Sequence, residues 1–181
     1  MKNTHTLSHT LTLLSLTAML VACSEKAPTA PSTAAPASAP VDEYVAPNIS
    51  RPTTLTAALK PTGHCSIDMV NYAVAAPSNT VTDKTKVKLQ GWAADATQGL
   101  LPQQVYLELE GTQKMWVRAV AGTDRPDVAT HFKNPQLQNA GWSAFANLST
   151  LPAGTYTLRV VQIMSDHSET LCETQRKLVL P

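Results

Sequence analysis

The stretch KVKLQGW, residues 86–92, decides the fold class because its side chains alternate along the chain. Val87 and Leu89 fall on one face of an extended segment, whereas the lysines and the glutamine fall on the other. The stretch QVYLELE, residues 104–110, repeats the pattern, with an apolar side chain at every second position. A period of two is the signature of a strand with one buried face. The two stretches therefore predict half-buried β-strands.

Further segments with strand character lie on both sides of these two. They are separated by turn signals such as Gly111-Thr112 and LPAGT, residues 151–155. Seven strands in about 120 residues predict an all-β fold, an immunoglobulin-like β-sandwich over residues 61–181. The five further segments are residues 65–72, 114–121, 142–148, 155–164 and 171–180.

Two segments do not fit a strand pattern. In RPDVATHF, residues 125–132, Pro126 and Asp127 suit the first turn of a short helix. NPQLQNAGW, residues 134–142, follows directly. We expect the two segments to form one connection that crosses between the sheets.

The N-terminal part of the chain has a different composition. Residues 1–10 carry one basic side chain, Lys2, and no acid, and an apolar run follows over residues 11–22. The run is shorter than the roughly 20 residues that a helix needs to cross a bilayer, so it predicts a secretory signal peptide over residues 1–22. Residues 24–60 are dominated by Ala, Pro, Ser and Thr. Such a tract buries too little apolar surface to offset its ordering entropy, which predicts a disordered linker over residues 23–60.

The junction of these two parts, Leu20-Val21-Ala22-Cys23, resembles the lipobox of bacterial lipoproteins. In that family the cysteine thiol carries a diacylglycerol, the signal is cut just before it, and the new amine is usually acylated, for example with palmitate. The resemblance implies that Cys23 opens the mature chain and that the membrane is its partner through lipid, because two or more acyl chains anchor stably. No aspartate follows Cys23, which in similar lipoproteins favours the outer membrane, facing the periplasm or the cell surface. An ordinary signal peptide with a chance cysteine is the alternative.

The cysteine count supports an exported domain. The chain has three cysteines, and a lipidated Cys23 leaves Cys65 in the first predicted strand and Cys172 in the last. In an oxidising compartment we expect a disulfide between them, with two free thiols as the alternative. The last strand does not alternate cleanly, since Arg176 shares a face with Cys172 and Leu178. This irregularity predicts a β-bulge.

The charge balance excludes one class of partner. The chain has 14 basic and 13 acidic residues, and removal of residues 1–22 takes away only Lys2, so the two signs become equal. A nucleic-acid-binding domain carries an excess of basic residues or a basic stripe, and neither is visible here. We therefore expect no nucleic-acid partner.

Residues that could support catalysis or metal binding are scattered. His64, His131 and His167 are isolated from one another, and SDHSE, residues 165–169, sits at a predicted hairpin tip where Ser, Asp and His are ordinary turn formers. No second histidine or carboxylate lies at ligand spacing, so we expect neither a metal nor another cofactor. A triad of Ser143, His131 and Asp127 can be written down, but no nucleophile-elbow motif supports it. We expect no enzyme activity.

The tryptophans are the remaining candidates for a binding surface. Trp92 and Tyr106 fall on the polar face of their strands, and Trp116 and Trp142 are ambiguous. Exposed rings in one plane would form a stacking platform for a sugar or a peptide. We favour the alternative, in which the rings close one end of a sandwich core.

Arg125 is a further candidate. Its guanidinium and the carboxylate of Asp127 could bind a ligand, but we favour an internal ion pair with a helix-turn cap.

Several short motifs together resemble an immunoglobulin-like module of bacterial envelope proteins, sometimes appended to membrane glycosyltransferases. The resemblance covers most of residues 86–180 and implies a sandwich with an accessory role. We therefore expect a lipid-anchored envelope protein with a non-catalytic binding or structural domain, whose partner is an envelope protein or a glycan. The alternatives are a carbohydrate- or peptidoglycan-binding module that uses its tryptophans, and a hydrolase with a concealed site. The motifs are GWAAD (91–95), RPDVATHF (125–132), NPQLQNAGW (134–142), LPAGTYTLRV (151–160) and a late cysteine.

Overall fold

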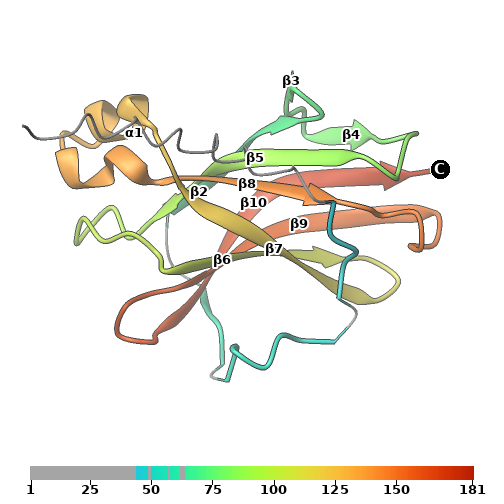
Figure 1. Cartoon of the computed structure of the whole chain (residues 1–181), viewed down its shortest axis with the longest axis horizontal. Helices are drawn as coiled ribbons and strands as arrows, with labels where there is room; N and C mark the ends of the chain where they lie inside the picture. The colour runs from blue at the N-terminus through green and yellow to red at the C-terminus, as the bar shows by residue number, and fades with distance from the viewer. Residues whose placement is uncertain (1–43, 49, 57, 62–63) are drawn as a thin grey trace, which may run out of the picture. The chain divides into compact units, whose positions relative to one another are not determined.

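The structure of the protein is a computed structural model, and it describes residues 44–48, 50–56, 58–61 and 64–181. Within these residues the chain forms ten strands and two short helical segments (Figure 1). The predicted all-β fold is confirmed. The elements are β1 (Lys60–Pro61), β2 (His64–Val70), β3 (Ala73–Val74), β4 (Ser78–Thr80), β5 (Val87–Ala94), β6 (Gln104–Glu110), β7 (Lys114–Thr123), α1 (Pro126–His131), the 3-10 helix η1 (Pro135–Asn139), β8 (Gly141–Ala146), β9 (Gly154–Ile163) and β10 (Glu169–Leu180).

The strands form two layers that share one strand. The hydrogen-bonded order is β1-β10-β9-β6-β7-β8-β5-β2-β3, and β4 pairs with β10. The first part of β7, up to Ala119, pairs with β6, and its last part, from Val120, pairs with β8. The register shifts between Ala121 and Thr123, where Gly122 has a φ of +98° that favours glycine. β7 therefore passes from one layer to the other.

One hydrophobic core lies between the layers. Alternate side chains of β5 and β8 point inward from the first layer, and those of β6, β9 and β10 from the second. The largest fully buried members are Trp142, Tyr156, Ile67, Leu89, Leu107, Leu109, Met115, Leu148, Leu158, Leu178 and Leu180. This arrangement is β-sandwich-like.

The connection between β7 and β8 differs in part from the expectation. A short helix begins at Pro126, as predicted, and η1 follows it. However, the end of β7 and the whole of β8 belong to the same layer. The connection therefore does not cross between the sheets, because β7 itself has already crossed.

Both faces of β6 are buried, although its alternation predicted one exposed face. Tyr106 is 7% exposed and Glu108 only 1%. The cover is the strap, which we define as the described residues 50–56 and 58–59. Leu55 of the strap is buried in a second apolar cluster against the outward side chains of the layer, with Leu59 packed beside it. That cluster contains Leu55, Tyr106, Trp116, Val161 and Ile163.

Polar contacts fix the strap as well. The guanidinium of Arg51 lies 3.1 Å from the carboxylate of Glu169, and the N–H of Thr56 donates to the same carboxylate at 2.6 Å. Glu169 is only 3% exposed. The prediction of a disordered linker through residue 60 is therefore wrong for its last part, because two leucines and a buried carboxylate dock this segment. The predicted signal peptide and the linker up to residue 43 lie outside the described residues.

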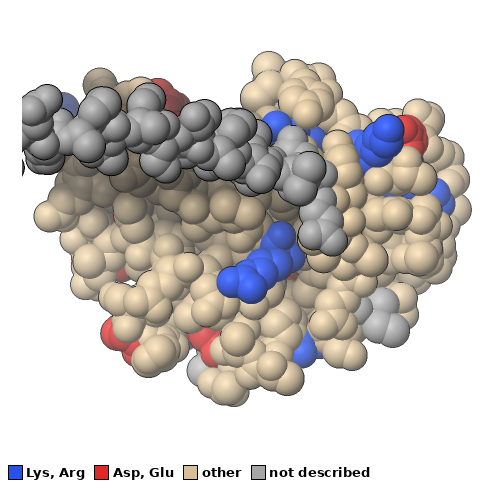
Figure 2. All heavy atoms as spheres, in the orientation of Figure 1, with Lys and Arg blue, Asp and Glu red and all other residues tan. Residues whose placement is uncertain are grey.

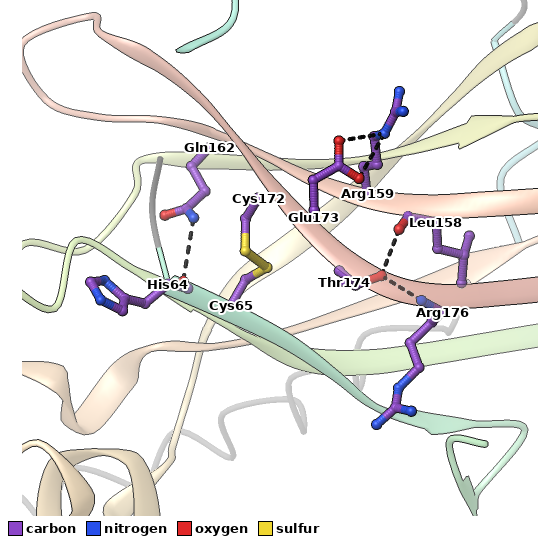
Figure 3. The surroundings of a disulfide bond; sticks show 9 residues. All are labelled: His64, Cys65, Leu158, Arg159, Gln162, Cys172, Glu173, Thr174 and Arg176. Atoms are coloured by element: carbon purple, nitrogen blue, oxygen red, sulfur yellow. Dashed lines mark hydrogen bonds and ion pairs between the residues drawn. A yellow bond between two sulfur atoms is a disulfide. The ribbon is translucent and has the colours of Figure 1, made fainter. Parts of the chain in front are cut away.

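The predicted disulfide between Cys65 and Cys172 is present, with 6.2 Å between the two Cα atoms (Figure 3). β2 pairs with β3 and β5, whereas β10 pairs with β9, β1 and β4, so the disulfide joins two strands that share no ladder. It links the layers on the side of the sandwich away from β7. We call this junction of β2 and β10 the seam.

The bulge predicted in the last strand is confirmed. The register of β10 against β9 shifts between Glu173 and Arg176. The hydroxyl of Thr174 donates to the carbonyl of Leu158 at 2.5 Å and accepts the N–H of Arg176 at 3.2 Å (Figure 3). Gln175 has a φ of +55°, so the extra residues turn away from the ladder.

Candidate functional site

One end of the sandwich carries a cavity of about 630 Å³, which we call the mouth cavity. The β9–β10 hairpin loop, the loop after β5 and α1 all lie at this end (Figure 1). The lining comes from both layers and is mostly polar. It consists of Lys60, His64, Asp95, Thr97, Gln98, Gln162, Met164, Asp166, Ser168 and Thr170.

Two carboxylates of the lining are fixed by their own turns. Asp95 accepts the N–H groups of Thr97 and Gln98 at 3.0 and 3.1 Å. Asp166 accepts the N–H of Ser168 at 2.9 Å, and hydrogen bonds from the hydroxyl and backbone of Ser168 hold the pKa of Asp166 below its usual value. Such turns place each carboxylate in one position without help from a ligand.

The hairpin tip is a turn, as expected, over residues 165–168, and Glu169 already belongs to β10. His167, at its centre, has a φ of +62°. No group of three His, Cys, Asp or Glu side chains within the described residues is arranged to hold a metal ion.

Gln162 is the most unusual residue of the mouth cavity. It is fully buried, and its side-chain amide donates to the carbonyl of His64 at 3.4 Å (Figure 3). Its Oε1 has no hydrogen-bond partner in the described part of the chain. Gln162 was not among the residues that the sequence pattern singled out, although a signal exists. The inward row of β9 is apolar at every second residue from Tyr156 to Val160, and a glutamine takes the next inward position.

Four rings form an aromatic rim beside the cavity. Phe132 lies at their centre, with ring centroids 5.6 Å from His64, 5.5 Å from Trp92 and 4.8 Å from His131. All three contacts are edge-to-face, so the rings do not share a plane. Trp92, His131 and Phe132 also line a shallow groove of about 390 Å³. His64 belongs to both the rim and the mouth cavity.

The three candidate tryptophans do not form one platform. Trp142 is 1% exposed and points into the core, where a Cβ on Gly91 would lie 2.6 Å from its ring. Trp116 is 5% exposed beneath the strap. The structure thus contradicts the stacking role considered for these two residues, and only Trp92 remains partly exposed.

Arg125 forms the expected internal ion pair. Its guanidinium donates to both carboxylate oxygens of Asp127, at 2.9 and 2.7 Å, and to Asp68 at 2.7 Å. The hydrogen bonds from Arg125 lower the pKa of Asp127 to about 2. The expected cap is absent, because α1 begins after Arg125 without a side-chain capping bond within the described residues. Asp127 instead lies in the first turn.

The residues of the hypothetical triad have other surroundings. Asp127 is held by Arg125, and His131 packs its ring against Phe132. Ser143 lies on β8, in register with Gln90 and Val120. Asp127 and His131 share the shallow groove, whose lining comes from β5 and α1 rather than from β8. The geometry gives no support to a nucleophile activated by His131.

Charged side chains do not gather on the face shown in Figure 2. Outside the grey atoms, basic and acidic side chains appear singly or in mixed pairs among uncharged residues.

No family model, curated protein or solved structure matches this chain. No helix in the described residues is long and apolar enough to span a membrane. The candidate site therefore rests on the geometry of the chain itself, and Cys23 lies outside the residues that the structure describes.

Proposed function

We propose that this protein is a lipoprotein of the bacterial cell envelope, anchored through Cys23, whose sandwich is a non-catalytic binding module. The outer membrane is the proposed location, and the mouth end of the sandwich is the proposed ligand side. An immunoglobulin-like fold of the sandwich is part of the same proposal and is supported by the motif resemblance described above.

The observation that carries the proposal is a lipobox-like junction in a chain whose domain is closed by a disulfide. Leu20-Val21-Ala22-Cys23 ends an apolar run, and Cys65 pairs with Cys172 far downstream. Disulfides persist in the periplasm and at cell surfaces but rarely in the cytosol. Both features therefore favour export, and the cysteine at the junction favours retention by lipid.

The mouth cavity favours binding over a purely structural role. A fully buried glutamine, two fixed carboxylates and an aromatic rim lie together at one end of the sandwich. Cavities of 300–1,000 Å³ are typical of small-ligand sites. A glycan or peptidoglycan is the alternative ligand to an envelope protein, and the polar lining favours the glycan.

Metabolic labelling tests the anchor. Cells that express the full chain receive an alkyne analogue of palmitate, and the protein is then isolated and tested for the label. We expect the parent to carry the label and Cys23→Ser to lack it, leaving unprocessed precursor or soluble protein, because the acyl chains supply the membrane affinity.

The neighbouring substitution Ser24→Ala is the matched control and should keep both the label and the membrane fraction. Label retained on Cys23→Ser would overturn the lipoprotein assignment.

A further inference from the structure

The side-chain oxygen Oε1 of Gln162 is a buried acceptor that has no hydrogen-bond partner among the described residues. A buried acceptor without a partner is destabilising, and nearly all such groups in folded proteins are satisfied. Two other buried side-chain atoms within the described residues also lack a hydrogen-bond partner. Glu108 Oε2 has a guanidinium, that of Arg159, at 3.7 Å, and the indole N–H of Trp142 belongs to a ring packed in the core. Of the three residues, only Gln162 lines the mouth cavity.

The surroundings of Gln162 supply both donors and acceptors. Asp95 and Asp166 offer carboxylate oxygens, and Lys60 offers an ammonium group. Hydroxyl groups from both loops and from β10 complete the lining. Thr170 is directly in register with Gln162 on the neighbouring strand. The cavity therefore presents a mixed set of hydrogen-bond donors and acceptors rather than charges of one sign.

This chemistry restricts the ligand. An anion would face Asp95 and Asp166, whose charges repel it. An ammonium ion would be attracted by the two carboxylates and by the face of a ring, but Lys60 repels it and it cannot accept a hydrogen bond from the hydroxyl groups of the lining. A neutral saccharide has hydroxyl groups that both donate and accept, and it has C–H faces that pack on aromatic rings.

We propose that the mouth cavity binds a neutral saccharide, with a ligand hydroxyl or N–H donating to Oε1 of Gln162 and the sugar ring extending toward His64 and Trp92. The inference rests on the proposed function as a binding module and names its ligand class. The proposed site lies at Gln162 in the mouth cavity instead of at Trp116 and Trp142, because these two rings are buried.

The test uses the full, lipidated protein in a detergent without a sugar headgroup. The probes are cellobiose, which carries hydroxyl groups only, and N,N′-diacetylchitobiose, which adds acetamide groups. Methylammonium chloride serves as the probe for the alternative, a cationic ligand. Saturation-transfer NMR and calorimetry report binding. We expect at least one disaccharide to bind and Gln162→Leu to weaken it about tenfold or more, because the acceptor is lost.

Controls separate binding from folding. Leucine continues the apolar row of β9 and removes the unpaired oxygen, but it also removes the hydrogen bond to the carbonyl of His64, so the melting temperature of Gln162→Leu should change by only about a few degrees. Thr170→Val, a near-isosteric change in the same cavity, should also weaken binding. Gln90→Leu, on the outward face of β5, should leave the affinity unchanged.

Several outcomes would overturn the inference. They are no saturation transfer from either disaccharide at millimolar concentration, equal affinity in the parent and Gln162→Leu, or binding of methylammonium in place of the sugars. None of them would affect the palmitate labelling at Cys23. An experiment that rejects the saccharide as ligand is thus distinguishable from one that rejects the lipid-anchored binding module.

Discussion

At the scale of single residues, Arg125 shows how one side chain ties three segments together. Its guanidinium bonds Asp68 of β2 and Asp127 of α1, while its backbone N–H donates to the carbonyl of Gln138 at 2.6 Å. Asp68 occupies the register shift between Ile67 and Met69 of β2, and such a bulge re-aims a side chain. The sequence pointed to the local pair, but a partner 57 residues earlier depends on the tertiary fold.

The ion pair gives a prediction with a defined pH window. The pKa of Asp127 falls from 3.8 to about 2 on folding, so its pair with Arg125 stabilises the fold above about pH 4, and this contribution is lost as the pH falls toward 2. Since the Asp127 side chain is 64% exposed, solvent screening reduces the effect. We expect Asp127→Asn to lower the free energy of unfolding by about 0.5–1 kcal/mol at pH 6.

Urea denaturation of parent and variant at pH 6 and pH 2 checks this expectation, and the difference should nearly vanish at pH 2. The control is Asp124→Asn, which removes a nearby carboxylate that pairs with the amide of Gln138. A difference that persists unchanged at pH 2 would show that the charge of Asp127 is not the cause.

At the scale of elements, the strap is the segment whose structure was predicted least well from amino-acid composition. The abundance of Ala, Pro, Ser and Thr in residues 24–60 is typical of a disordered tether. Yet Leu55 and Leu59, four residues apart, supply the apolar surface that covers β6. Tyr106 and Trp116 on the outward face were the visible signal that something covers this layer. Which segment covers it depends on docking, and an alternation pattern contains no such information.

The strap leads to a stability prediction. Leu55 is 5% exposed among Tyr106, Trp116 and the outward side chains of β9. We expect Leu55→Ala to lower the free energy of unfolding by about 2 kcal/mol, the low end for buried leucines, because the cluster is small and can partly collapse. Hydrogen exchange should rise at the backbone amides of Asn48 and Trp116, which form an isolated β-bridge just before the strap begins.

Val45→Ala is the matched control, since Val45 is 48% exposed and its loss should change stability by less than about 0.5 kcal/mol. If Leu55→Ala proves as mild as Val45→Ala, the strap does not dock in solution.

The long elements could be predicted well for a physical reason. All seven predicted strands exist, and β6 has the predicted bounds, because alternation records which face meets the core. The two- and three-residue strands β1, β3 and β4 were missed, since so few residues carry no periodicity. The passage of β7 between layers also escaped prediction. One continuous alternation runs through it, and only Gly122 marks the change.

At the scale of the whole domain, closure of the sandwich depends on two different devices. On one side, β7 connects the layers through its own ladders with β6 and β8. On the other side, the seam has no ladder between β2 and β10, and the disulfide and the bond from Gln162 to the carbonyl of His64 join the layers there. The mouth cavity lies beside this seam and shares His64 and Gln162 with it. The same two residues therefore contribute to closure of the sandwich and line the proposed ligand site.

Removal of the seam disulfide should destabilise the domain. Cys65→Ala with Cys172→Ala opens a loop with a sequence separation of 107 residues, so we expect the free energy of unfolding to fall by about 4–5 kcal/mol on the chain-entropy model. The β-type circular dichroism should persist in mild conditions, because every ladder remains. Hydrogen exchange should rise first at β2 and at the β10 bulge, while β6 stays protected at the centre of its layer. Equal exchange throughout the domain, or free thiols in the oxidised parent, would show that the disulfide does not hold this side closed.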